Sequence, residues 1–223
     1  MNKEKIKILY EDDAVLVCVK PAGVPTQSRR IGTPDMESLL KNHIVQQQAV
    51  KKPPYLAVIH RLDQPVEGLL VFAKTPAAAR ELNNQLTTRG FGKHYRALLE
   101  GIPTPSEGTL EHFLRKDART NSSAVCSRDT PGAKKARLHY HIVHTEGFRS
   151  IADITLDTGR HHQIRVQMSA IGCPIVGDSK YGWSNSADAV SSDGRIELYA
   201  CRLEFRHPVT NALMRFELPA LPF

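Results

Sequence analysis

A charged loop held between two short apolar runs constrains this chain more than any other feature. Residues 55–59 end in Ala-Val-Ile, and residues 68–74 read Gly-Leu-Leu-Val-Phe-Ala-Lys. Apolar runs of this length are typical of buried strands. The residues between them, 60–67, read His-Arg-Leu-Asp-Gln-Pro-Val-Glu. Because a strand is expected on each side of this loop, we expect Asp63 to be fixed on a rigid scaffold.

The hydrophobic pattern elsewhere predicts many strands and few helices. Helical spacing of apolar residues predicts helices at 36–48, 75–88 and 161–171. Strands are predicted at 14–20, 55–59, 68–74, 93–99, 109–114, 136–144, 150–156 and 195–205. Polar loops are predicted at 24–35, 115–133 and 182–194. Strands joined with few intervening helices favour an α+β fold whose central sheet is mixed and mainly antiparallel.

Length and composition are those of an ordinary globular protein. The chain has 223 residues, 41% hydrophobic and 24% charged, so we expect one domain covering residues 1–223. No apolar run approaches the roughly 20 residues that span a bilayer, and no apolar signal core follows the first residues. We therefore expect a cytoplasmic protein. Its four cysteines are widely spread without a CxxC pair, which argues against a zinc knuckle or a disulfide framework.

The positive charge of the chain is clustered. The net charge is +7 and the pI is near 9.3. Basic residues gather at 29–30, 51–52, 115–119 and 134–137. Such clusters suit a polyanionic partner, although many basic proteins never bind nucleic acid.

Three segments together closely resemble the RluA-type RNA pseudouridine synthases, which isomerise uridine within RNA. They are residues 57–74, residues 93–101 (Lys-His-Tyr-Arg-Ala-Leu-Leu-Glu-Gly) and residues 158–167 (Thr-Gly-Arg-His-His-Gln-Ile-Arg-Val-Gln). The resemblance implies a long central sheet in two halves flanked by helices, with the active cleft across its middle. Many relatives also carry an N-terminal S4-type RNA-binding domain. Because the resemblance begins by Ile8, we expect a stand-alone catalytic domain.

Asp63 is the first candidate catalytic residue. On local evidence it is a turn aspartate paired with Arg61, and the neighbouring His60 and Arg61 favour its ionised form. The resemblance implies that Asp63 is the nucleophile, attacking either the sugar C1′ or the base. It also implies that Arg61 enters the RNA stack where the target base is extruded. The chain departs from the family at residues 66–67, where Val-Glu replaces the usual Thr-Ser.

Two further catalytic candidates have an ordinary structural reading as well. Tyr95 on local evidence is a strand aromatic in a core, whereas the resemblance makes it the tyrosine that stacks on the target base. Arg165 borders the apolar stripe of its helix and reads locally as a surface arginine. The resemblance makes Arg165 the partner of the catalytic carboxylate. Asp178 and Lys180 match a family segment beside the cleft, but their sequence fits a simple turn equally well.

The remaining expectations concern partners. The histidines at 139, 141, 144, 161 and 162 have no grouped carboxylates, so we expect no metal, and the isomerisation requires no cofactor. The expected partner is RNA, either transfer RNA or large-subunit ribosomal RNA, bound by a monomer. Candidate RNA-binding residues are His60, Arg61, Arg29, Arg30, Lys134 and Lys135. Two alternatives stay open: a non-catalytic RNA-binding protein with this fold, and a metal-dependent nuclease.

Overall fold

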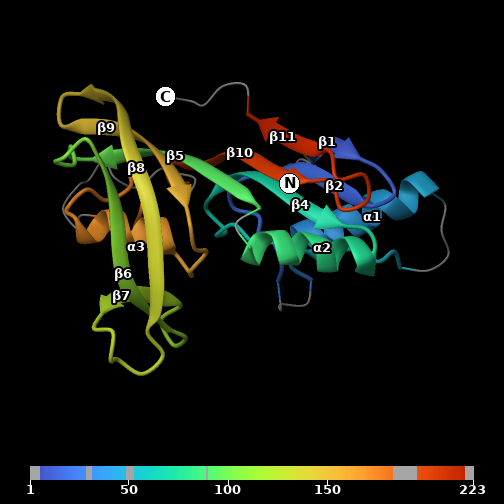
Figure 1. The fold of residues 1–223 in the computed structure, drawn as a ribbon, viewed down its shortest axis with the longest axis horizontal. Helices are drawn as coiled ribbons and strands as arrows, with labels where there is room; N and C mark the ends of the chain where they lie inside the picture. The colour runs from blue at the N-terminus through green and yellow to red at the C-terminus, as the bar shows by residue number, and fades with distance from the viewer. Residues whose placement is uncertain (1–5, 29–31, 49–52, 89, 183–194, 219–223) are drawn as a thin grey trace. The chain divides into compact units, whose positions relative to one another are not determined.

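The computed structural model describes residues 6–28, 32–48, 53–88, 90–182 and 195–218. These residues divide into two compact units, the first formed by the described residues up to 92 and from 200 to 218, and the second by those between 93 and 199 (Figure 1). The first unit contains β1 (Lys7–Glu11), β2 (Val15–Lys20), α1 (Met36–Gln48), β3 (Ala57–Val58), β4 (Glu67–Ala73), α2 (Pro76–Thr87), most of β10 (Leu198–Arg206) and β11 (Leu213–Glu217). The second contains nearly all of β5 (Gly92–Glu100), then β6 (Glu107–Asp117), β7 (Ser122–Cys126), β8 (Lys134–Glu146), β9 (Arg149–Leu156) and α3 (Gln163–Ala170).

The sheet of the first unit has the strand order β1-β2-β4-β10, with β3 on β4 and β11 on β10. Strand β2 pairs antiparallel with β4, placing Val15 opposite Ala73 and Lys20 opposite Gly68. Residues 15–18 of β2 are buried on both faces of the sheet. This explains why the sequence of β2 is continuously apolar rather than alternating.

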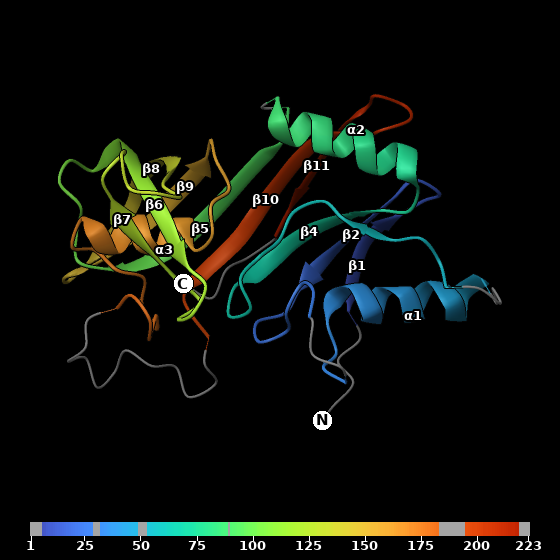
Figure 2. The same ribbon diagram turned by 90° about the horizontal axis from the view of Figure 1, so that it is seen from below.

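The helices of the first unit bury their apolar faces. Helix α2 begins at the predicted cap, where the Ala78 N–H donates to Thr75 Oγ1 at 3.1 Å. Its Leu82 packs in one cluster with Val71 of β4 and Phe205 of β10. Figure 2 shows the strands of this unit running between α1 and α2 in projection. Helix α2 therefore supports the strands on both sides of the loop of Asp63, β3 and β4.

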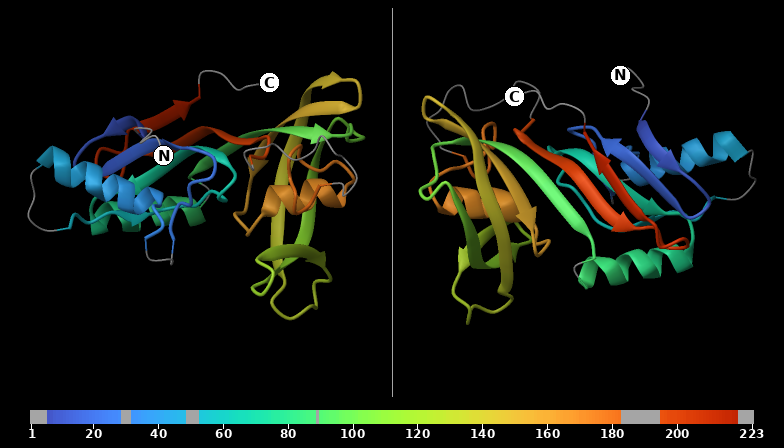
Figure 3. Two further views of the ribbon diagram at one scale, coloured as in Figure 1. Left: turned by 180° about the vertical axis from the view of Figure 1, so that it is seen from behind. Right: turned by 45° about the horizontal axis from the view of Figure 1, so that its top comes forward.

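The sheet of the second unit has the order β5-β9-β8-β6-β7, and each neighbouring pair is antiparallel. Helix α3 packs against β6 and β7 (Figure 3). Strand β5 alternates, so that Tyr95, Ala97 and Leu99 are buried on one face. The expected α+β class with a mainly antiparallel sheet is confirmed by these pairings.

Several predicted boundaries were wrong. The predicted loop at 115–133 contains β7 and the end of β6, while β1 and β11 were not predicted. The strand predicted at 55–59 is only Ala57–Val58. Helix α3 begins at Gln163 rather than residue 161, because His162 adopts a left-handed conformation with φ 55° that interrupts a helix. The predicted loop at 182–194 lies outside the described residues, apart from Gly182.

Candidate active site

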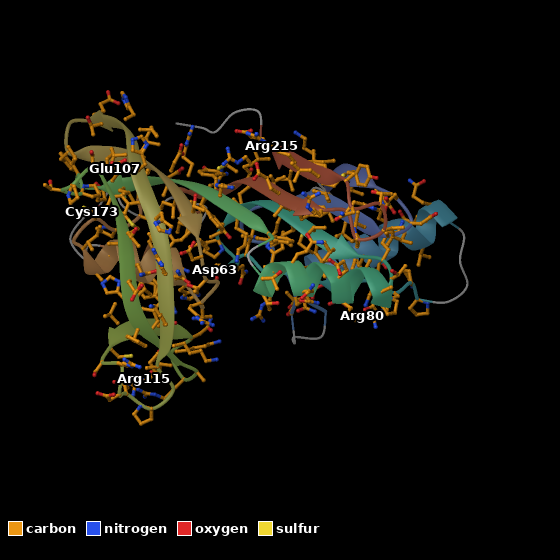
Figure 4. The ribbon with its side chains drawn as sticks, viewed as in Figure 1. Asp63, Arg80, Glu107, Arg115, Cys173 and Arg215 are labelled. Carbon is orange, nitrogen blue, oxygen red and sulfur yellow. The ribbon has the colours of Figure 1, made fainter. Side chains whose placement is uncertain are left out.

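The loop that carries Asp63 is tied to the segment after β2 through its backbone. Gln64 makes two hydrogen bonds to Gly23, one through its carbonyl and one through its side-chain amide, both 2.9 Å. The Leu62 N–H donates to Thr26 Oγ1 at 3.2 Å, and this hydroxyl donates to the Leu62 carbonyl at 3.1 Å. These ties hold the residues on both sides of Asp63, which Figure 4 labels. The neighbours of Asp63 on both sides are therefore anchored to the segment after β2.

The start of β4 after this loop requires a glycine. Gly68 has φ 140°, and a Cβ at this position would lie 2.5 Å from the Ala200 carbonyl oxygen of β10. No side chain fits so close to a backbone. Gly68 therefore allows the backbones of β4 and β10 to lie close together at the residue that follows Glu67.

Lys20 lies at the end of β2, close to the same loop, and is fully buried. Its Nζ donates to the carbonyls of Pro21, Val24 and Gln64 at 2.9, 2.7 and 2.9 Å. Burial lowers the pKa of Lys20 to about 8, and the negative charges of Asp63 and Glu67 oppose this shift. Sequence reasoning missed Lys20. Its signal was a lysine that ends a buried apolar strand immediately before Pro-Ala-Gly.

Arg165 in the second unit is buried and pairs with Asp178. Its Nε and Nη2 donate to the two carboxylate oxygens of Asp178, each at 2.7 Å. The guanidinium also lies over the ring of Tyr181, 5.0 Å from its centroid. The local reading of Arg165 as a surface residue was wrong, because its neighbours hold it by two hydrogen bonds and a stacked ring. The pairing of Arg165 with Asp63 stays a prediction.

Asp178 sits in a turn that it also closes. Its Oδ1 accepts the N–H groups of Lys180 and Tyr181 at 3.0 and 3.2 Å. The turn reading of Asp178 therefore applies, and the same carboxylate also holds Arg165. Its place beside the cleft stays a prediction. Its side chain is fully buried, so an arginine partner is needed to compensate its charge.

The histidines before α3 connect this helix to β7. His162 Nδ1 lies 2.7 Å from the Tyr181 hydroxyl, which accepts the Ser123 N–H at 2.8 Å. His161 Nδ1 lies 2.9 Å from Ser123 Oγ, and its ring stacks on His162 with centroids 3.7 Å apart. Burial, and secondly the nearby Arg165, lower the pKa of His162 to about 3. A neutral His162 can accept the Tyr181 hydroxyl hydrogen, so this cluster reads as a neutral support for Arg165.

Tyr95 lies on β5 opposite Ile154 of β9. It is only 6% exposed and shares its buried face with Ala97. Burial on an otherwise apolar strand face is what the core reading requires. It does not exclude the catalytic reading, because an active-site aromatic is also supported by its strand. The catalytic role of Tyr95 stays a prediction.

The candidate RNA-binding residues differ in their surroundings. Lys134 and Lys135 are exposed at the start of β8, and Lys135 Nζ lies 2.8 Å from a Glu111 oxygen. Arg61 is exposed. His60 packs edge-on against Phe91, with ring centroids 5.3 Å apart, and its Nε2 accepts the Val71 N–H at 3.4 Å. Arg29 and Arg30 lie outside the described residues, and the RNA role of all six stays a prediction.

Within the described ranges, no group of three or more His, Cys, Asp and Glu side chains is placed to hold a metal ion. His139 Nε2 does lie 3.2 Å from an Asp157 oxygen, a carboxylate partner that the sequence did not suggest. The same part of the chain contains no helix long and apolar enough to cross a membrane.

Comparison with known proteins gives the family. The family model described as RNA pseudouridylate synthase matches residues 14–170. A ribosomal large subunit pseudouridine synthase D of Nitrosomonas europaea is 35% identical over 223 residues, covering 96% of this chain and 62% of that relative. A dual-specificity RNA pseudouridine synthase RluA of Salmonella typhi is 34% identical over 215 residues, covering 96% of this chain and 92% of that relative. The chain therefore belongs to the RNA pseudouridine synthase family, as the three sequence segments indicated.

A solved structure supports the fold. The structure titled human RNA pseudouridylate synthase domain containing 4 superposes with a TM-score of 0.78, covering 97% of this chain and 89% of that one at 23% identity. At this identity the likeness concerns the fold alone. Family membership, rather than the fold, places the chain among isomerases that act on RNA.

Proposed function

We propose that this protein converts uridine to pseudouridine in structured RNA, with Asp63 as the nucleophile. The observation that carries the proposal is family membership together with a loop anchored on both sides of Asp63. The Asp63 carboxylate attacks C1′ of the target ribose, the bond between C1′ and N1 breaks, and uracil leaves with the bonding electrons. The uracil turns and C5 bonds to C1′ as the carboxylate departs; C5 then loses its proton and N1 gains one, so that no proton is gained or lost overall. Dividing the isomerisation into two displacements lowers the barrier of each.

The other candidate residues have supporting roles in this proposal. Arg165 pairs with the Asp63 carboxylate and keeps it charged and oriented. Tyr95 stacks on the target base and accepts a proton in the last step. Arg61 fills the gap that the extruded uridine leaves, where a planar guanidinium replaces stacking.

The reaction itself is the direct test. We expect the purified protein, incubated with total RNA in EDTA, to form pseudouridine without strand cleavage. A non-catalytic RNA-binding protein would bind RNA and form none. A metal-dependent nuclease would cleave RNA in the absence of EDTA, and the cleavage would stop when EDTA is added. Either of these results would replace the proposed function.

We infer that the substrate is transfer RNA or large-subunit ribosomal RNA. The name of the Nitrosomonas relative supports the ribosomal class, and the dual specificity in the name of the Salmonella relative is compatible with a second class of RNA. Mapping pseudouridine in both RNA classes, with and without the gene, identifies the site. If both RNA classes keep all of their pseudouridines when the gene is removed, this inference is contradicted.

Electrostatic binding gives a quantitative expectation. Changing both Lys134 and Lys135 to glutamine should reduce the slope of log affinity against log salt by about 1 to 2, because each phosphate contact contributes roughly 0.7 to 0.9. Lys41→Gln is the matched control, since Lys41 is another partly exposed lysine and pairs with Glu37 at 2.6 Å in α1. Its slope should stay at the wild-type value. An unchanged slope in the double variant would show that these lysines are only solvated surface.

A further inference from the structure

Lys93 lies at the start of β5, two residues before Tyr95. Because side chains alternate along a strand, both residues belong to one face of β5, about 6.6 Å apart along it. Lys93 is only partly exposed, and burial lowers the pKa of its ammonium. Removing an ammonium from water is costly unless partners compensate its charge. The fold therefore holds a positive charge near Tyr95 at a cost in stability.

Within the described part of the chain, the ammonium of Lys93 makes no hydrogen bond or ion pair, and burial is the only cause of its pKa shift. The other lysines there that are withdrawn from water have partners. Lys20 donates to three carbonyls, and Lys41 and Lys74 pair with glutamates. A partly buried polar group without a protein partner calls for an explanation, and one explanation is a ligand that supplies the partner.

The ammonium lies beside the loop that precedes α3. A Cβ on Gly159 would lie 3.3 Å from Lys93 Nζ, and apart from the chain neighbours of Gly159 no other heavy atom of the described residues lies within 4 Å of that position. Gly159 is itself exposed, as is Arg160 after it. The missing side chain of Gly159 therefore leaves room beside the ammonium for an atom of a ligand.

The ligand that best suits this ammonium is an anion that arrives with the substrate. Phosphate groups of RNA are permanently charged and are the usual partners of lysine in nucleic-acid complexes. A departing uracil is negative only during the reaction, so it would not compensate the ammonium in the bound complex. Lys93 and Tyr95 share one face of β5, so a base stacked on Tyr95 and a backbone phosphate at Lys93 can belong to the same nucleotide or to neighbours.

We propose that Lys93 binds a backbone phosphate of the RNA next to the target uridine and so fixes the position of that nucleotide over Tyr95. The inference rests on the proposed function, which supplies the RNA and the stacking role of Tyr95. Lys93 is then a binding residue. A phosphate contact that is equally strong before and during the reaction raises affinity and leaves the chemical step unchanged.

The first test compares Lys93→Met with Lys7→Met on a stem-loop RNA that carries the mapped uridine. Lys7 is an exposed lysine of β1, so its variant controls for the loss of one positive charge. Lys93→Met should weaken RNA affinity by about 10-fold and reduce the slope of log affinity against log salt by roughly 0.7 to 0.9. Its single-turnover rate with saturating enzyme should stay within about threefold of wild type. Lys7→Met should match wild type in all three measurements, and Lys93→Arg should keep most of the affinity.

The second test identifies the phosphate. The phosphates on the 5′ and 3′ sides of the target uridine are replaced, one at a time, by a neutral methylphosphonate. At the phosphate that Lys93 contacts, wild type should lose about 10-fold in affinity, and Lys93→Met should lose almost nothing more, because the two changes remove the same interaction. Elsewhere the two losses should add.

The melting temperature separates binding from a structural role. Lys93→Met removes an uncompensated ammonium, so without RNA it should melt at or above the wild-type temperature. If Lys93→Met does not fold, Lys93→Gln takes its place in the binding tests.

The results that would overturn the role of Lys93 are distinct from those that would overturn the proposed function. A wild-type affinity and salt slope in the variant, or losses that add at both phosphates, would exclude the phosphate contact. A slower rate at saturating enzyme with unchanged affinity would assign the ammonium to the leaving uracil instead, and affinity lost in proportion to a lower melting temperature would make Lys93 structural. A wild-type protein that binds RNA but converts no uridine would overturn the proposed function, and the salt slope of Lys93→Met on bulk transfer RNA would then decide the phosphate contact.

Discussion

Replacing Asp63 with asparagine is expected to abolish pseudouridine formation and leave RNA affinity close to wild type. The amide has nearly the shape of the carboxylate but cannot act as the nucleophile, so the rate should fall by several orders of magnitude. The loop should survive the change, because the hydrogen bonds of Leu62, Gln64 and Val66 that hold it use none of the atoms that differ between aspartate and asparagine. Single-turnover rates with saturating enzyme measure the chemical step directly.

The control for this variant is Asp13→Asn. Asp13 is an exposed aspartate of the same unit, so the same chemical change there should leave the rate and the melting temperature almost unaltered. Residual activity of Asp63→Asn above about a tenth of wild type would reject Asp63 as the nucleophile. A large loss of RNA affinity would instead show that the carboxylate holds the loop or the substrate in place.

Much of the scaffold of Asp63 was predictable from the sequence, because β4, which follows the loop, and β2, which pairs with β4, are buried on both faces. Residues 15–18 and 69–73 are apolar without interruption, and the structure buries all of them. Lys20 was not predictable in the same way. Composition rules place lysine at the surface, and only the carbonyls of Gln64 and Val24, brought close by the fold, show why this one is buried.

The elements that sequence reasoning missed are short strands with mixed polarity. Strand β7 reads Ser-Ser-Ala-Val-Cys and lies at the edge of its sheet, where only Ser123 is buried. Strand β11 alternates between exposed and partly buried residues. Such edge strands depend on their neighbours for hydrogen bonds rather than on an apolar run, so their sequences resemble loops. For the same reason the contact of Ser123 with His161 and Tyr181 could not be predicted.

The support of Arg165 was partly visible in the sequence. The segment His-His-Gln-Ile-Arg indicated a functional helix, but it did not indicate which partner each side chain contacts. The structure shows Gln163 accepting from Thr158 Oγ1 at 2.8 Å and donating to the Arg137 carbonyl at 3.1 Å. His162 reaches the Tyr181 hydroxyl, and Tyr181 lies under Arg165. These long-range contacts depend on tertiary packing, which local spacing does not encode.

Arg165→Lys is expected to slow the chemical step by about 100-fold or more while weakening RNA binding only slightly. Lysine keeps the charge but loses the planar fork that holds Asp178 by two hydrogen bonds and stacks on Tyr181. If the guanidinium also orients the Asp63 carboxylate, as proposed, the lysine variant should leave the nucleophile misaligned. Single-turnover rates, RNA affinity and melting temperature are measured on the same preparations.

A purely structural role of Arg165 must be separated from an action on Asp63. Asp178→Asn provides the comparison, because it breaks the same buried ion pair and leaves the guanidinium of Arg165 in the chain. If Arg165 only stabilises the turn at residues 178–181, both variants should lose rate in proportion to their lost melting temperature. If Arg165 orients the nucleophile, Arg165→Lys should lose far more rate than Asp178→Asn at equal stability. An unchanged single-turnover rate in Arg165→Lys would remove Arg165 from the catalytic machinery.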